Sequence, residues 1–159
     1  MVELRQENPE DWWEVEALYD LCFSPGREAL SSYRLRDGRA PVADLSLVAR
    51  DEEGILGGAI RFWPVCVGPA KALLLGPVAV HPTRQGEGLG GALIRGGLAR
   101  AEALGWTRVI LVGDAPYYSR FGFEQLLGVE MPPPTNPSRV LGYGDWRDVQ
   151  GRVRQDREP

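Results

Sequence analysis

The stretch "HPTRQGEGLGGAL" at positions 81–93 decides how this chain folds, because it places four glycines within six residues. It follows the apolar run "KALLLGPVAV" (71–80) and overlaps the start of a helix-like pattern over 88–106. Glycine allows sharp turns and close backbone approach, although it costs conformational entropy on folding. The pattern therefore predicts a buried strand, a tight loop and a helix, with the loop backbone close to a ligand.

The chemistry of such a loop points to a phosphate-bearing ligand. Free backbone N–H groups and the helix dipole both favour an anion at a helix N-terminus. A nucleoside triphosphatase loop is excluded, because no lysine followed by serine or threonine comes after the glycines. The loop therefore fits either a dinucleotide or another carrier of a pyrophosphate group.

A dinucleotide-binding loop remains an alternative on spacing alone. Gly86, Gly88 and Gly91 match its G-x-G-x-x-G pattern. Asp114 lies 23 residues after Gly91, near the expected place of a ribose-binding acid. However, "HPTRQ" separates the glycines from their strand, and only 68 residues follow Gly91. That remainder is too short for the repeated strand–helix units of a full dinucleotide fold, so this alternative is disfavoured.

Hydrophobic periodicity predicts the elements around the loop. Strands are expected over 2–6, 43–50, 55–68, 71–80, 107–113 and 124–131, and helices over 8–23, 27–36, 88–106 and 114–123. The turn "DEEG" (51–54) joins an antiparallel pair, whereas the later strand–helix–strand unit must form a right-handed parallel crossover. The predicted fold class is α/β, with a mixed, mostly antiparallel sheet, one parallel strand–helix–strand crossover and flanking helices.

Length and composition limit the kind of protein. The 159 residues suit one domain over 1–159, and the charged end 147–159 is expected to be a solvated tail. The net charge of −4 argues against a nucleic-acid partner. The longest apolar run, at 72–80, is too short to cross a bilayer. No secretory signal pattern opens the chain, so we expect a cytoplasmic protein with no membrane partner.

The residue types that most often bind metals are sparse and scattered. Cys22 and Cys66 lie in apolar surroundings, which predicts buried, reduced thiols. His81 is the only histidine, so the chain has no Cys/His cluster and no metal is expected. A catalytic cysteine would likewise have His81 as its only histidine base.

Two motifs carry a resemblance to a known family. "VAVHPTRQGEGLGGALI" (78–94) resembles the acyl-CoA motif of the GNAT superfamily of N-acetyltransferases, whose hallmark Q/R-x-x-G-x-G/A is matched from Gln85 to Gly90. "YYSRFGF" (117–123) resembles the family's Tyr-x-x-x-Gly-Phe segment, with Tyr118 at the tyrosine. Together with "GPVAVHP", these motifs look like a bacterial subgroup of predicted acetyltransferases, and the element order covers nearly the whole chain.

The resemblance implies an N-acetyltransferase that moves an acetyl group from acetyl-CoA, its cosubstrate, to a primary amine by direct attack. The loop would bind the pyrophosphate, and strands 71–80 and 107–113 would part near Val80 to admit the pantetheine arm. Tyr118 would be the general acid that protonates the departing thiolate. The implied cofactor-binding residues are Val78, Ala79, Val80, Arg84, Gln85, Gly86, Glu87, Gly88, Leu89, Gly90 and Gly91.

The base, the acceptor and one cofactor contact stay open. His81 is a weak candidate for the general base, and Asp114 either contacts the cofactor or caps a helix. The acceptor would be a small-molecule or peptide amine, and the protein a monomer or homodimer. An acceptor rim that favours an acidic or aromatic amine is expected from Arg27, Tyr33, Arg34, Tyr143 and Trp146. An acyl-CoA-binding sensor without turnover is the alternative from a different functional class.

Overall fold

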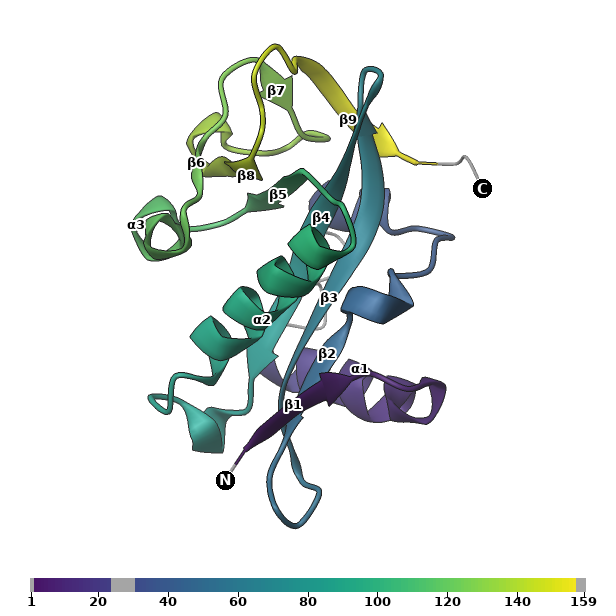
Figure 1. Ribbon diagram of the computed structural model, residues 1–159, viewed down its shortest axis with the longest axis vertical. Helices are drawn as coiled ribbons and strands as arrows, with labels where there is room; N and C mark the ends of the chain where they lie inside the picture. The colour runs from purple at the N-terminus through teal and green to yellow at the C-terminus, as the bar shows by residue number, and fades with distance from the viewer. Residues whose placement is uncertain (1, 24–30, 157–159) are drawn as a thin grey trace.

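The computed structural model describes residues 2–23 and 31–156, which form a mixed sheet with helices on both faces (Figure 1). The strands of the main sheet, in spatial order, are β1 (Glu3–Gln6), β2 (Leu47–Arg50), β3 (Leu56–Val67), β4 (Ala70–Val80), β5 (Arg108–Val112), β8 (Val140–Gly144) and β6 (Glu124–Gln125). Along this path β4 and β5 pair in parallel, and the other neighbours are antiparallel. The predicted fold class is confirmed.

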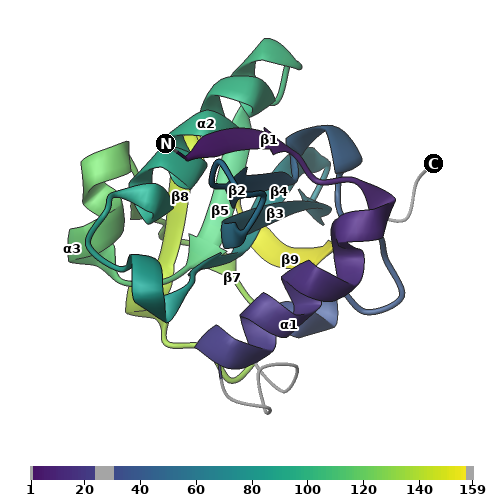
Figure 2. The ribbon, with the colours of Figure 1, turned by 90° about the horizontal axis from the view of Figure 1, so that it is seen from below.

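Helices cover the two faces of the sheet (Figure 2). α1 (Trp12–Cys22) lies on one face and α2 (Leu89–Ala103) on the other. Successive strand residues point to opposite faces, so each helix meets its own set of apolar side chains. Leu93 of α2 is fully buried in a cluster with Phe62, whereas α1 buries Val15 in a separate cluster.

The predicted parallel crossover is present as β4, α2 and β5. β5 leads into the short helix α3 (Ala115–Tyr118), after which Gly122 turns the chain toward β6 with a φ of 93°. The register between β2 and β3 also shifts by one residue, at Gly57. These features bring the ends of β4 and β5, the start of α2 and α3 to one edge of the molecule.

Two elements expected in the N-terminal half differ from the elements that the structure has there. The expected strand 43–50 begins only at Leu47, because Ala43–Leu45 form a short 3₁₀ turn. The described part of the expected helix 27–36 is also a 3₁₀ turn, Ser31–Leu35, and residues 27–30 lie outside the described residues. In both segments the apolar pattern covers too few residues to distinguish a turn from a longer helix or strand.

The C-terminal region contains more strand than the sequence indicates. The expected strand 124–131 is divided into β6 and β7 (Val129–Glu130), and β8 was not expected. The expected solvated tail 147–159 is corrected over β9 (Gly151–Gln155), which pairs with β3 and β7 and buries Val153. "GRVRQ" has one apolar residue, so its strand depends on the open edge of β3, which no local pattern reveals.

Candidate active site

β4 and β5 part next to α3, and a cavity of about 180 Å³ lies there. Their parallel pairing ends at Leu74 and Ile110, whereas β4 continues to Val80. The expected separation of the two strands is therefore confirmed. The cavity is lined by Phe23, Tyr33, Arg36, Leu75, Gly76, Pro77, Val78, Leu111, Val112 and Tyr118.

A β-bulge in β4 shapes one wall of this cavity. The register between β3 and β4 shifts by one residue opposite Arg61, at Gly76 and Pro77. Trp63 Nε1 donates a hydrogen bond to the Gly76 carbonyl at 2.6 Å, and the Tyr19 hydroxyl donates to the Pro77 carbonyl at 2.9 Å. Both side chains are buried, so neither bond competes with water. The two bonds fix the bulge and with it the cavity wall.

Tyr118 lines the cavity from the end of α3. Its ring packs so closely on Gly113 that a Cβ there would lie 2.5 Å from Tyr118 Cε2. Burial is the main cause that raises the pKa of Tyr118 to about 12, and the neighbouring Tyr117 adds to it. The hydroxyl therefore keeps its proton at neutral pH, as a general acid must.

Tyr117 points to a different place. Its ring centroid lies 5.0 Å from that of Tyr118, with the two planes nearly perpendicular. The Tyr117 hydroxyl lies 3.3 Å from the position that a Cβ on Gly90 would take, so this side chain packs over the first turn of α2. Asp114 Oδ2 accepts a hydrogen bond from the Tyr117 backbone N–H at 3.2 Å and thereby caps α3.

The glycine loop is open to solvent at the N-terminus of α2. Gly86 and Gly88 have φ values of 86° and 79°, in the left-handed region that glycine tolerates best. A Cβ at either position would meet no atom within 4 Å, so the backbone is accessible to a ligand. Gln85 Nε2 donates to the Val80 carbonyl at 3.0 Å, which ties the loop to the end of β4.

Arg84 and Glu87 form ion pairs within and next to the loop. The Arg84 guanidinium lies 2.7 Å from a carboxylate oxygen of Asp51 and 3.2 Å from one of Glu87. The hydrogen bond from Arg84 to Glu87, followed by the charge of Glu87, raises the pKa of the guanidinium. These contacts join the loop to the turn between β2 and β3.

The other predicted cofactor-binding residues lie at the same edge. Val78 lines the cavity, and Val80 Cγ2 lies 3.6 Å from the position of a Cβ on Gly90. Ala79 and Leu89 are buried, so their side chains belong to the core. The structure therefore brings the predicted residues together between the cavity and the loop.

The histidine and the cysteines have local structural contacts. His81 Nδ1 accepts a hydrogen bond from the Thr83 backbone N–H at 3.1 Å, so the imidazole caps the turn before the loop. Cys22 and Cys66 are free thiols, as expected, but they are only partly buried, which corrects the expectation of burial. Burial raises the pKa of both thiols. His81 is not among the residues that line the cavity at Tyr118.

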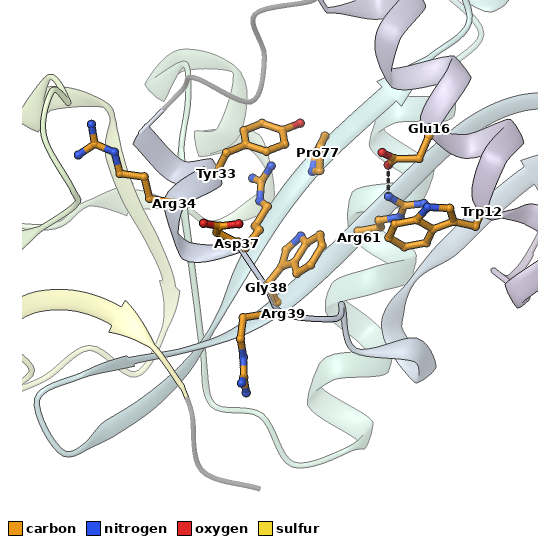
Figure 3. Close-up of a pocket in the computed structure, with 11 residues that line it drawn as sticks. Trp12, Glu16, Tyr33, Arg34, Asp37, Gly38, Arg39, Arg61 and Pro77 are labelled. Atoms are coloured by element: carbon orange, nitrogen blue, oxygen red, sulfur yellow. Dashed lines mark hydrogen bonds and ion pairs between the residues drawn. The ribbon is translucent and has the colours of Figure 1, made fainter.

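A larger cavity of about 420 Å³ adjoins the first on the side of α1 (Figure 3). Tyr33, Arg36 and Pro77 line both cavities. The remaining residues of the larger cavity are Trp12, Glu16, Arg34, Asp37, Gly38, Arg39, Arg61 and Trp63. Its size is that of a pocket for a small molecule.

The residues of the expected acceptor rim do not all lie at the larger cavity. Tyr33 and Arg34 line the larger cavity, and Arg27 lies outside the described residues. Tyr143 instead lines a hollow beside α2. Trp146 packs against the hydrophobic cluster that includes Val140 of β8. These two aromatic residues are therefore not among those that line the larger cavity.

Three residues in or next to the two cavities escaped prediction. Gly113 ends a strand in "VGDAP", and a glycine at such a place signals close packing, here of Tyr118. Trp63 and Arg36 carry no comparable local signal. Their roles depend on the bulge in β4 and on the turn 31–35, which are distant from each other in sequence.

Residues 43–125, which include the loop and Tyr118, match the family of the Acetyltransferase (GNAT) domain. The chain belongs to the GNAT acetyltransferase family. A curated relative, the uncharacterized N-acetyltransferase YhbS of Escherichia coli K12, is 36% identical over 123 residues, which cover 76% of this chain and 72% of YhbS. The uncharacterized N-acetyltransferase YjhQ of the same strain is 38% identical over 120 residues, covering 73% and 66% of the two chains.

Solved structures of GNAT proteins resemble this one along almost its full length. YhbS from Escherichia coli, crystallised in complex with CoA, superposes with a TM-score of 0.83 at 30% identity over 98% of this chain and 89% of YhbS. A GNAT family acetyltransferase from Brucella melitensis, in complex with acetyl-CoA, gives a TM-score of 0.75 at 33% identity over 99% and 97%. This GNAT protein therefore has neighbours that bind CoA or acetyl-CoA.

Membrane and metal features were sought over residues 2–23 and 31–156. No helix in these ranges is long and apolar enough to cross a membrane. The same residues contain no group of three or more histidine, cysteine, aspartate or glutamate side chains that could hold a metal ion.

Proposed function

We propose that this GNAT acetyltransferase transfers an acetyl group from acetyl-CoA to a primary amine by direct attack, as one domain over 1–159. The observation that carries the proposal is the position of Tyr118, whose ring lines the cavity between the parted strands β4 and β5. Acetyl-CoA supplies an acetyl group that is activated as a thioester. The chain must bind this molecule, orient it and move a proton.

The glycine loop suits the pyrophosphate of the cosubstrate. Gly86 and Gly88 leave open space above the loop, and the N-terminus of the 15-residue helix α2 favours an anion. Backbone groups of Val78 to Val80 are proposed to contact the pantetheine arm, since that segment has left β5 but remains beside the cavity. Arg84 and Glu87 are proposed to support the loop through their mutual ion pair rather than through their charges on the ligand.

Tyr118 is proposed as the general acid. A thiolate leaves more easily when it receives a proton, and a tyrosine in this cavity holds one at its hydroxyl. The raised pKa of Tyr118, about 12, supports this role because the protonated form dominates throughout the physiological range. No side chain is assigned as the base, and water is proposed to take the proton from the acceptor amine.

Acetyl-CoA binding and turnover test the proposed function separately. Calorimetry is expected to detect acetyl-CoA binding, and a panel of small amines, polyamines and peptide N-termini is expected to release free CoA thiol with at least one acceptor. Binding of NADH in place of acetyl-CoA would contradict the proposal. Binding of acetyl-CoA with no turnover on any amine would favour an acyl-CoA sensor.

Gly88→Val is expected to weaken acetyl-CoA binding by roughly 10- to 100-fold, because a branched side chain would strain the left-handed backbone and enter the space above the loop. Calorimetric titration measures the change. Gly105→Val is the matched control, since Gly105 follows the other end of α2 with a φ of 90° and equally open surroundings. Equal losses of affinity in the two variants would contradict a role for the loop in binding.

The pH dependence of kcat follows from the state of Tyr118. An acid works only while it is protonated, so a pKa raised to about 12 shifts the loss of activity to higher pH than an ordinary tyrosine with a pKa of about 10 would give. We expect kcat at saturating acceptor to show no decline between about pH 8 and 10. A pH–rate profile at saturating acetyl-CoA measures this, and a falling limb near pH 9 would contradict it.

A further inference from the structure

The larger cavity meets the smaller one at Arg36, Tyr33 and Pro77. Figure 3 shows Trp12 and Glu16 entering from α1 on one side and Tyr33, Arg34 and Asp37 on the other. At about 420 Å³ it accommodates one small molecule, so an acceptor can lie in it with its reactive end in the smaller cavity.

At the end of this cavity next to α1, the positive charge of Arg61 is neutralised by carboxylates. Arg61 donates to both carboxylate oxygens of Glu7, at 3.0 and 2.9 Å, and to Glu16 at 2.5 Å. The Arg61 guanidinium also stacks over Trp12, 3.9 Å from the ring centroid. This end therefore presents mainly the indole of Trp12, and Trp63 also lines the cavity, so the two indoles offer apolar surface.

The opposite end carries Arg34, Arg36 and Arg39, with the exposed Asp37 at the rim. Arg36 is the arginine that reaches the junction of the two cavities. Its guanidinium carbon lies 4.1 Å from the Tyr33 ring centroid and 5.8 Å from that of Trp63. One of its terminal nitrogens lies 3.1 Å from the position of a Cβ on Gly76, so the cation stands directly beside the bulge.

We propose that the acceptor is a small α-amino acid with an apolar or aromatic side chain. This proposal rests on the proposed acetyl transfer. The amino group lies in the smaller cavity, the carboxylate binds Arg36, and the side chain packs on Trp63 and Trp12. A planar guanidinium is suited to a carboxylate, with which it forms two parallel charge-assisted hydrogen bonds. Arg36 lines both cavities, so a carboxylate bound to it lies next to an amine in the smaller cavity, as in an α-amino acid.

The reaction balances without any further reactant. The amine nitrogen forms a bond to the acetyl carbon, the carbon–sulfur bond of the thioester breaks, and sulfur takes a proton from Tyr118. The amine loses one proton to water, and Tyr118 regains one from water. The products are the N-acetyl amino acid and the free CoA thiol, and the carboxylate serves only in recognition.

Three acceptors that share one side chain test the proposal. L-Phenylalanine, its neutral amide and phenethylamine are compared by release of CoA thiol under saturating acetyl-CoA. A hydrogen bond to a charged group contributes enough to raise kcat/KM for phenylalanine roughly 10- to 100-fold above both other amines. The amide has the least basic amine of the three, so its slower reaction cannot come from a lower fraction of neutral amine. Equal rates, or faster reaction of either amine without the carboxylate, would overturn the proposal.

A variant of Arg36 and a binding measurement complete the test. In Arg36→Gln the preference for phenylalanine is expected to fall to within about threefold of the other amines, whereas Arg147→Gln, an exposed arginine far along the chain, is expected to keep it. An unchanged preference in Arg36→Gln would overturn the assignment of that residue. Should Arg36→Gln fail to fold, the preference of the parent protein still decides the substrate class.

The proposed substrate class, an α-amino acid, can also be tested by a binding measurement that needs no turnover. N-Acetylphenylalanine and N-acetylphenethylamine are titrated calorimetrically into the CoA-loaded protein, where the carboxylate-bearing product is expected to bind roughly 10- to 100-fold more tightly. Equal or reversed affinities would overturn the α-amino acid proposal while leaving acetyl transfer intact. Failure of the protein to bind acetyl-CoA at all would instead reject the proposed function, so the two failures are distinguishable.

Discussion

Tyr118→Phe is expected to lower kcat by roughly 10²- to 10⁴-fold, the usual contribution of a positioned proton donor, with little change in acetyl-CoA affinity. The substitution removes one hydroxyl from the cavity between β4 and β5 and keeps the ring that packs on Gly113. Single-turnover measurements of acetyl transfer, together with calorimetric binding of acetyl-CoA, separate the loss of the proton donor from a loss of binding.

The neighbouring tyrosine provides the matched control. Tyr117→Phe also removes one hydroxyl from α3, but from a side chain that packs over Gly90 at the start of α2. We expect Tyr117→Phe to keep kcat and at most to change the KM for acetyl-CoA. If Tyr118→Phe kept its full turnover, the residue would have no place in the mechanism and water would be the acid.

A substitution at Gly113 tests whether the position of the Tyr118 hydroxyl matters, in addition to its presence. A Cβ at residue 113 would collide with the Tyr118 ring at 2.5 Å and with Leu111 Cδ1 at 3.0 Å. Gly113→Ala is therefore expected to displace a tyrosine that remains chemically intact, and to lower kcat in the same direction as Tyr118→Phe. A kcat equal to that of the parent protein would show that the ring has no required position.

The glycine loop and Tyr118 could be predicted from sequence because each belongs to a short segment with its own signal. Gly86 and Gly88 adopt left-handed conformations that few other residues tolerate, so their chemistry is already present in the local composition. The buried β4 and β5 were recognised in the same way from continuous apolar runs. Their separation was expected only from the family resemblance.

The larger cavity could not be predicted, because its parts meet through pairings between distant segments. The bulge at Gly76 exists only where β4 aligns with β3, and Tyr19 reaches Pro77 from 58 positions earlier in the chain. The strand β9 similarly depends on the free edge of β3. Arg61 is the clearest case, since this charged residue of β3 is only 2% exposed and its partner Glu7 lies 54 positions earlier in the chain.

Arg61→Met is expected to lower the free energy of unfolding by about 3–5 kcal/mol, the usual effect of removing one partner from a buried ion pair. Burial is the largest single effect and lowers the pKa of the Arg61 guanidinium, but the hydrogen bonds to Glu7 and Glu16 and the neighbouring charges together raise that pKa. Without that cation, the carboxylate of Glu7, whose side chain is 6% exposed, is left buried and unpaired by Arg61. Denaturant unfolding followed by tryptophan fluorescence measures the change.

The exposed pair of Arg147 and Asp145 provides the control for a lost charge. Its side chains are 87% and 44% exposed, so water replaces the missing partner and Arg147→Met is expected to leave the unfolding midpoint unchanged. A loss of stability as large as that of Arg61→Met would contradict the assignment to burial. So would an Arg61→Met protein as stable as the parent.

The double variant Arg61→Met/Glu7→Leu distinguishes the buried charge from simple packing. When both partners become apolar, no charge is left in the interior, and buried ion pairs replaced in this way often cost little or even gain stability. We therefore expect the double variant to recover at least half of the stability lost in Arg61→Met. Glu16 does not prevent this recovery, because its side chain is 25% exposed and can turn to water. A double variant less stable than Arg61→Met would show that the shapes of these side chains, rather than their charges, hold α1 against the β4 bulge.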